Sequence, residues 1–557
     1  MYRFYQRPAS YDSCSWDPEF LNFRHNFHAP TENRTSDDYL NSFITGPENV
    51  LNSCHGPQPA RRDFAYDMAT VVRFMESPAG CLNGPACAHQ IKLVADFCRY
   101  SKRRERDKRH VALIYEWENK PGRLIRQREA YSKPLTHEDL HTKLCRRRYA
   151  EPPSISAAKT DGPQVSNPEK ISADRRVIYI NNLNASTISI LANTTSRLET
   201  PAIQRTIFKH LAAQTSLDVY IARGFKTFSL ELHISYFCLR KDGNLTQCDQ
   251  RQRWDRAGPL RRSLACPARP NGNPPGSHPS FSIYETQLSI AVTGVDHWRW
   301  TAWGFVDTWF EPGDAVSVYD EGEASGSRPD PLSNGQLDVE PPECLPRKYF
   351  LRLLEIQIGL IAKEWDYILC IVGQEVRAIE TDPLFTFPER SFQSKDGRES
   401  VRRLASWNGD MIRLVGTLLK TLSQTLVAWD AFQRTDISYF IDTDTCDDIP
   451  SSSSSYASSM MGDENAYQYK PEKLAPSLRI IDKTFLNIQK TYDEMEQLKM
   501  TLEDLRRALA RGGENYSTFV QQRTGEHIKL LTWITIVSNP TQENPTQESF
   551  HFQTHKD

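Results

Sequence analysis

The sequence predicts an α+β protein in which a domain of mixed strands and helices is followed by long helices. Runs of alternating or β-branched apolar residues, the pattern of strands, concentrate before residue 310. After an acidic stretch rich in Gly, Pro and Ser at 311–346, apolar residues recur every three or four positions, as on the buried face of a helix. A length of 557 residues leaves room for more than one domain.

The order of these patterns divides the chain into segments. We expect an irregular N-terminal region (1–109), an α/β domain (110–310) with loop insertions (150–173 and 241–280), a linker (311–346), a helical hairpin (347–443), a disordered linker (444–472), a stalk helix (473–537) and a polar tail (538–557). The second linker is expected to be disordered because it contains a run of Ser and few apolar residues.

Within the α/β domain, apolar alternation predicts strands and helical spacing predicts short helices. The expected strands lie near 110–117, 177–180, 219–221, 227–239, 281–291 and 298–309. The expected helices lie at 136–148, 186–193 and 201–213. Thr136 and Asp139 have the spacing of a capping box, which places the start of the first helix.

The second half is expected to contain three long helices, at 349–378, at 399–441 and from Pro476 onward. Along the third, apolar residues alternate by four and three, the spacing of a coiled-coil seam. The seam residues are Ile481, Phe485, Ile488, Tyr492, Met495, Leu498, Leu502, Leu505 and Leu509.

Composition excludes several classes of function. The 68 Lys and Arg nearly balance the 70 Asp and Glu, giving a formal net charge of −2, so we expect no nucleic-acid partner. The twelve cysteines show no C-x-x-C pair and the N-terminus has no apolar signal segment, so we expect reduced thiols in a cytosolic compartment. No nucleotide-binding, kinase or hydrolase motif occurs, and we expect no enzymatic activity.

Candidate metal ligands fall into three groups. Cys81, Cys87, His89 and Cys98 match the spacing of no common zinc module, so we interpret them as structural thiols and an exposed histidine. The pairs His25/His28 and His137/His141 have helical spacing and are interpreted as solvated. Hard divalent cations prefer several oxygen ligands. An acidic cluster therefore gives a candidate cation contact or, alternatively, the start of a disordered linker: Asp442, Asp444, Asp447 and Asp448.

The most apolar run of the chain is short. Leu530–Val537 spans eight residues, or about 12 Å of helix, against a bilayer core of about 30 Å. The chain as written is therefore not expected to span a membrane. As a helix these residues would be apolar on most sides, and we expect 528–537 to promote self-association or peripheral membrane contact.

Three stretches, taken in order, resemble the fungal CorA-like divalent-metal (Mg²⁺) transporters. They are Asp174–Ile180 with Phe208–Leu211 and Gly224–Arg240; Ala291–Trp298 with Trp300–Trp303 and Val306–Phe310; and His527–Val537. The resemblance covers roughly residues 110–537 and concerns the cytosolic part of that family only. The Gly-Met-Asn signature and a second apolar helix are absent from this sequence.

The resemblance implies an α/β cytosolic domain, long stalk helices and a homo-oligomer, which in that family is a pentamer. It also implies a location at the cytosolic face of a membrane, or in the cytoplasm if the chain is complete as written. Mg²⁺ would be bound weakly between subunits by carboxylates, for which the acidic cluster at Asp442–Asp448 and also Asp307 are candidates.

Three interpretations remain open. The chain is a CorA-like transporter sequence truncated before the pore, a soluble metal-sensing relative, or a cytosolic helical scaffold for other proteins. An in-frame apolar stretch of about 20 residues coded after Val537 would select the first.

Overall fold

The computed structural model describes a subset of the 557 residues. The described residues are 68–76, 88–100, 109–118, 126–127, 133–146, 148, 173–196, 198–221, 227–241, 248–267, 281–294, 299–311, 316, 329–338, 345–381, 394–440 and 475–538. They belong to two compact units. The first unit comprises 1–266, 275–372 and 414–497, and the second comprises 267–274, 373–413 and 498–557.

The first unit is built on an eight-stranded mixed sheet. Its order is β2-β1-β3-β8-β7-β5-β4, with β6 paired to β7. The strands are β1 (Ala112–Glu118), β2 (Arg126–Gln127), β3 (Arg175–Asn181), β4 (Ser216–Ile221), β5 (Phe228–Lys241), β6 (Ser263–Ala265), β7 (Phe281–Gly294) and β8 (Trp300–Val306). Only the β3–β8 pair is parallel among the described strands. The central strands β3, β5, β7 and β8 are buried over most of their length, because helices cover both faces of the sheet.

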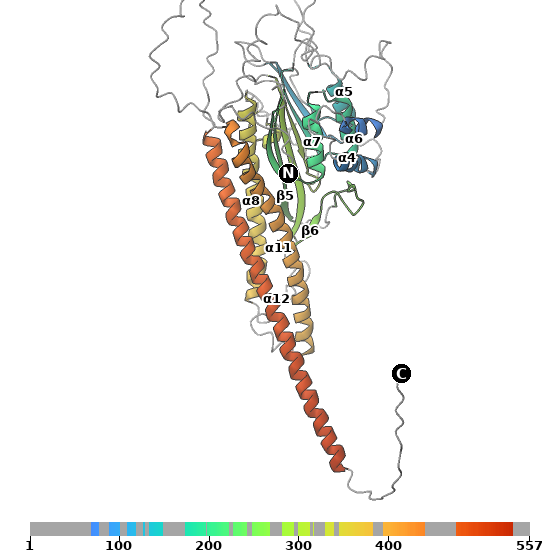
Figure 1. Cartoon of the computed structure of the whole chain (residues 1–557), viewed down its shortest axis with the longest axis vertical. Coiled ribbons are helices and arrows are strands. Elements are labelled where there is room, and N and C mark those ends of the chain that lie inside the picture. The colour runs from blue at the N-terminus through green and yellow to red at the C-terminus, as the bar shows by residue number, and fades with distance from the viewer. Residues whose placement is uncertain are drawn as a thin grey trace, which may run out of the picture. The chain divides into compact units, whose positions relative to one another are not determined.

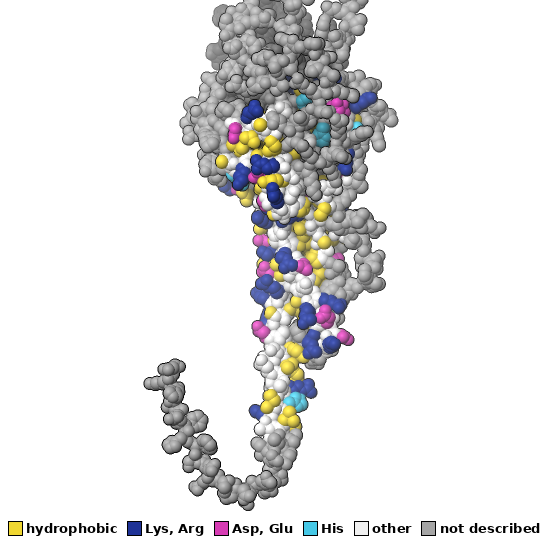
Figure 2. All heavy atoms as spheres, turned by 90° about the vertical axis from the view of Figure 1, so that its right-hand side faces the viewer, with side chains coloured by type: hydrophobic (Ala, Val, Ile, Leu, Met, Phe, Trp, Pro, Cys, Tyr) yellow, Lys and Arg dark blue, Asp and Glu magenta, His cyan; other side chains and the backbone are white. Residues whose placement is uncertain are grey.

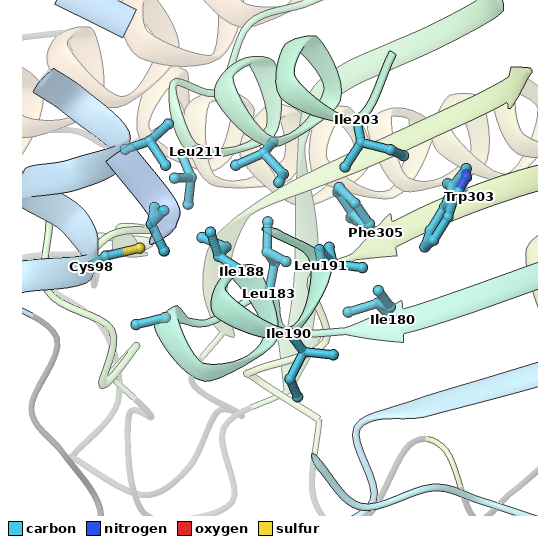
Figure 3. Packing of buried hydrophobic residues seen from close by; sticks show 14 of the residues in the cluster. Cys98, Ile180, Leu183, Ile188, Ile190, Leu191, Ile203, Leu211, Trp303 and Phe305 are labelled. Carbon is cyan, nitrogen blue, oxygen red and sulfur yellow. The ribbon is translucent and has the colours of Figure 1, made fainter. Parts of the chain in front are cut away.

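Short helices cover one face of this sheet (Figure 1). They are α3 (Met68–Glu76), α4 (Ala88–Tyr100), α5 (His137–Cys145), α6 (Ala185–Thr194) and α7 (Thr200–Leu211). Their apolar sides form a single cluster with β3 and β8. In Figure 3, Ile188 and Leu191 of α6 and Ile203 of α7 lie near Ile180 and Phe305 of the sheet.

The starts of these helices follow local sequence signals. Thr136 and Asp139 form both hydrogen bonds of a capping box, as the sequence predicts. Asn184 caps α6 by accepting from the Thr187 backbone N–H. The described helix α5 ends at Cys145, three residues before the predicted end, because the backbone turns extended at Arg146.

The long helices α8 (Pro346–Glu380), α11 (Lys395–Thr435) and α12 (Ala475–Ser538) contribute residues to both units. In the first unit α8 contacts the other face of the sheet. Trp300 of β8 packs on Tyr349 of α8 at 5.3 Å between ring centroids. The helices also pack on one another, since Trp429 of α11 stacks on Phe485 of α12 at 4.5 Å. This confirms the predicted α+β fold class with long helices.

The coiled-coil seam of α12 is largely as predicted. Ile481, Phe485, Ile488, Met495, Leu502, Leu505 and Leu509 are buried. Tyr492 and Leu498 are only half-buried. In the second unit the Asn408 amide of α11 donates to the Leu502 carbonyl at 3.0 Å, and α12 continues unbroken through Gly512 and Gly513. Among the described residues, no helix combines the length and apolar character needed to cross a bilayer.

Some elements differ from the sequence expectation. The region 1–109, expected to be irregular, contains α3 and α4, whose apolar sides join the main core. The insertion at 241–280 contributes β6. The predicted helix 399–441 ends at Thr435 and is followed by a 3₁₀ turn at Ile437–Phe440. These short elements depend on neighbours distant in sequence, so local periodicity does not reveal them.

A buried turn in the linker 311–346 also packs against the sheet. Leu332, in the 3₁₀ turn Pro331–Ser333, is fully buried against Gly304 of β8. The Gln357 side chain of α8 donates to the Leu332 carbonyl at 2.6 Å, and the Tyr349 hydroxyl donates to Asp330 at 2.7 Å. Gly304 is therefore required by packing, since a Cβ at this position would overlap the Leu332 side chain.

Gly304→Ala is expected to lower the free energy of unfolding by about 1–3 kcal/mol, because the added methyl group overpacks the contact with Leu332. Gly416→Ala is the matched control. Gly416 lies inside α11 with open space around its missing Cβ, so alanine there is expected to stabilise by up to about 1 kcal/mol. Urea unfolding of the two variants measures both effects. Equal effects of the same sign would contradict this assignment.

Candidate functional site

A layer of charged and polar side chains is buried between α7 and the sheet. We call it the α7 charge layer; it consists of Arg205, Lys209, His210, Glu231, His233, Asp249, Arg251, Arg261 and Asp307. Helical spacing puts Arg205 and Lys209 on the same side of α7, and strand alternation puts Glu231 and His233 on the same face of β5.

Glu231 is the centre of one half of the layer, and its side chain is fully buried. Its Oε1 accepts from Arg205 Nη2 at 2.6 Å and its Oε2 accepts from Lys209 Nζ at 3.0 Å. Lys209 Nζ also donates to Asp218 of β4 at 2.9 Å. Burial alone would raise the pKa of Glu231, but Arg205 and Lys209 hold that pKa well below its usual value. Glu231 is therefore ionised and paired.

Asp307, just after β8, is the centre of the other half. Its Oδ1 accepts from Arg251 Nη1 at 2.7 Å and its Oδ2 accepts from Arg261 Nε at 2.6 Å. His210 of α7 contacts both Asp307 and Ser289 of β7. Its Nε2 lies 3.3 Å from Asp307 Oδ1, and its Nδ1 lies 3.1 Å from Ser289 Oγ. Burial would raise the pKa of Asp307, yet Arg251 and Arg261 keep it well below its usual value.

These contacts correct the expectation that Asp307 is a metal ligand. Both of its oxygens accept from guanidinium groups, and two buried positive charges within hydrogen-bond distance repel a cation. The layer therefore attaches α7 and the segment 248–262 to the sheet. In the described part of the chain, no group of three or more His, Cys, Asp or Glu has a geometry suited to a metal ion.

The other predicted site residues are only partly visible. The cluster Asp442, Asp444, Asp447 and Asp448 lies outside the described residues, as do Cys81, Cys87, His25 and His28. His89 is exposed at the start of α4 and Cys98 is buried in the core, in agreement with their interpretation as an exposed histidine and a structural thiol.

A second polar constellation lies on α5. His137 Nε2 is 3.2 Å from the Asn184 amide oxygen, and one turn later His141 Nε2 is 3.6 Å from Cys145 Sγ. The prediction that both histidines are solvated holds only in part, since each is half-buried. Together with Glu138 they form the order H-E-x-x-H, so the interpretation that this pair lies outside such a context is wrong.

The comparisons with known proteins give a weak structural likeness. No protein-family model matches the chain, and no curated protein matches its sequence significantly. One similar solved structure is that of the full-length CmaX protein, at 10% identity and a TM-score of 0.33, covering 80% of this chain and 91% of the other. Another is the ZntB cytoplasmic domain from Vibrio parahaemolyticus, at 9% identity and a TM-score of 0.24, covering 74% and 98%. These scores are too low to carry an argument.

Asp307→Asn is expected to lower the free energy of unfolding by about 3–5 kcal/mol, because the neutral amide leaves the buried guanidinium group of Arg261 without its counter-charge and leaves Arg251 paired with Asp249 alone. Asp255→Asn is the matched control, since Asp255 pairs with Arg253 at the surface and its loss leaves stability unchanged. Chemical denaturation compares the two. A loss for Asp307→Asn no larger than for the control would contradict a structural role of the charge layer.

Acid is expected to destabilise the fold through the buried histidines. Burial, with Lys209 nearby, lowers the pKa of His233 to about 4. Between pH 6.5 and pH 4 the unfolded chain therefore binds a proton that the folded chain does not, and stability falls as the pH falls through this window. The loss attributable to His233 is on the order of 3 kcal/mol at pH 4.

His233→Gln should make the dependence of unfolding free energy on pH shallower across this window, whereas the exposed His89→Gln should leave the slope unchanged. Thermal unfolding at several pH values measures this slope for each variant. The same slope in wild type and His233→Gln would show that this histidine is not the responsible group.

Proposed function

We propose that this chain is the cytosolic part of a CorA-like divalent-metal transport protein. In this proposal it works as a homo-oligomer at the cytosolic face of a membrane, and it is not an enzyme. The sequence resemblance supports this, because its first two stretches lie on β3, α7, β5, β7 and β8, which belong to one sheet domain, and its third lies on α12. In that family such a domain is followed by stalk helices, and here α8, α11 and α12 follow the sheet.

The observation that carries the proposal is the exposed distal part of α12. The helix has 64 residues, about 96 Å by its rise per residue. Beyond Tyr516 its described side chains are exposed, including apolar ones: Phe519, Val520, Ile528, Leu530 and Leu531. The exposed fractions of Ile528, Leu530 and Leu531 are 58%, 60% and 61%. Figure 2 shows apolar side chains on the surface of this end of the helix.

Apolar residues exposed at several positions of one helix favour a cover, either other copies of the chain or lipid. Within the chain, the same helix is covered along its earlier part by α8 and α11, for example through Trp429 and Phe485. The change from covered to exposed along one continuous helix supports a stalk whose far end is completed by assembly or by a membrane. The segment 528–537 is the proposed place of that contact.

Mg²⁺ is the proposed ion, bound weakly and between subunits. The charge layer offers no ligand to such an ion, since Glu231 and Asp307 are already paired. The acidic cluster at Asp442–Asp448 remains the candidate, because hard carboxylate oxygens suit Mg²⁺. Since each subunit would supply half a site, a dissociation constant of roughly millimolar or weaker is expected for the isolated chain.

Deletion of 528–557 is expected to abolish self-association and vesicle binding while leaving the melting temperature within a few degrees of wild type, because the described side chains of 528–532 are exposed. Sedimentation velocity and vesicle flotation measure the two properties. Thr518→Glu, an exposed polar position on the same helix, is the control and should behave as wild type.

Two outcomes would overturn the proposal. If the deletion unfolds the long helices, the segment is part of a core. If the intact chain stays monomeric and does not float with vesicles, the exposed face of α12 has no such partner, and a scaffold function becomes the better interpretation.

A further inference from the structure

We propose that His141 and Cys145 on α5 form a binding site for a borderline-soft transition-metal ion, with Zn²⁺ as its representative. The two residues are one helical turn apart, and His141 Nε2 lies 3.6 Å from Cys145 Sγ. Cys145 is a reduced thiol and is exposed. Imidazole nitrogen and thiolate sulfur are the ligands that zinc prefers in proteins. The site is independent of the proposed function, which concerns a hard cation.

The separation of the two ligand atoms fits one metal ion. Bonds of about 2.05 Å to nitrogen and 2.3 Å to sulfur, at a tetrahedral angle, place the two ligand atoms about 3.6 Å apart. The observed distance is 3.6 Å. An ion can therefore bind both side chains without a change in the distance between their ligand atoms. In its absence the same distance suits a weak S–H···N hydrogen bond, and binding turns the imidazole so that its Nε2 lone pair faces the ion instead of the sulfur.

The helix that carries the pair is held firmly. The capping box of Thr136 and Asp139 closes its first turn, and Leu140 and Leu144 are buried in the main core. Lys143 Nζ reaches the Ile114 carbonyl of β1 at 3.5 Å. His141 and Cys145 alternate with these anchoring residues, so they lie toward the outer side of a helix whose inner side is packed. Anchoring of this kind lowers the cost of orienting ligands.

The preceding turn explains why the ligands are not those of an H-E-x-x-H zinc centre. In such a centre His137 and His141 would bind the ion together. Here His137 Nε2 contacts Asn184, and the Asn184 side chain in turn accepts from Thr187 N–H as the cap of α6. His137 and Cys145 are about 12 Å apart along the axis, so one ion cannot bind all three residues. The structure therefore favours His141 and Cys145, rather than His137 and His141, as the metal-binding pair.

Binding at this pair has a simple chemical balance. The Cys145 thiol loses its proton to solvent and the thiolate binds the ion, while the neutral imidazole of His141 donates its Nε2 lone pair. Water fills the remaining coordination positions, since Cys145 lies at the surface. No electron transfer is involved. Mg²⁺ does not compete, because it prefers oxygen ligands.

The test is a Zn²⁺ titration of the full chain against a chromophoric chelator, repeated with Co²⁺ to read the thiolate-to-metal charge-transfer absorption. Wild type is expected to bind one equivalent more than Cys145→Ser and than His141→Gln, and only wild type should show the Cys145-dependent absorption. Excess Mg²⁺ should not displace the ion. Two matched controls, His137→Gln on the same helix and Cys248→Ser at another exposed cysteine, should keep the full equivalent.

The melting temperature of each metal-free variant is measured first, so that a loss of binding is not confused with a loss of fold. Equal binding by wild type, Cys145→Ser and His141→Gln would overturn the proposal. A loss caused by His137→Gln but not by Cys145→Ser would also overturn it, and would indicate the H-E-x-x-H pair instead.

Discussion

Two ionised carboxylates, Glu231 and Asp307, lie fully buried beneath α7, and the packing of the first unit depends on their neutralisation. A buried carboxylate without partners costs several kcal/mol, so each must be matched by positive groups with good geometry. Arg205 and Lys209 come from α7, while Arg251 and Arg261 come from a segment between β5 and β7. The charge layer therefore decides where α7 and that segment sit on the sheet.

The opposite face of the sheet follows a different rule. Its contact with α8 is largely apolar, with one ion pair between Arg240 of β5 and Glu364 of α8 at 2.9 Å. Gly304 lets Leu332 approach β8, and Trp300 meets Tyr349 at the start of α8. The sheet therefore holds α7 through buried ion pairs as well as apolar packing, and holds α8 largely through apolar contacts.

The burial of apolar side chains changes along the helix α12. The buried seam of α12 runs from Ile481 to Leu509, and the side chains described beyond Tyr516 are exposed. Where a helix extends beyond the helices that cover it and still carries apolar side chains, the exposed apolar surface favours association. The resemblance to CorA-like proteins and this exposed end both favour a function that needs more than one copy of the chain or a membrane. The His141–Cys145 pair on α5 lies in the sheet domain and adds a separate, soft-metal chemistry.

The sequence by itself determined the elements whose signals are local. The four-and-three spacing from Ile481 onward predicts the seam, and Thr136 with Asp139 predicts the start of α5, because a helix turn needs only neighbours within four residues. Only the tertiary structure decided the partners of Asp307, since Arg251 and Arg261 stand 56 and 46 positions before it in the chain. It also decided that α3 and α4 are helices, because their short apolar sides are stable only against a core assembled from distant residues. Asp307 was predicted as a metal ligand from its charge alone. The fold places the guanidinium groups of Arg251 and Arg261 against it, so its carboxylate has a structural function instead.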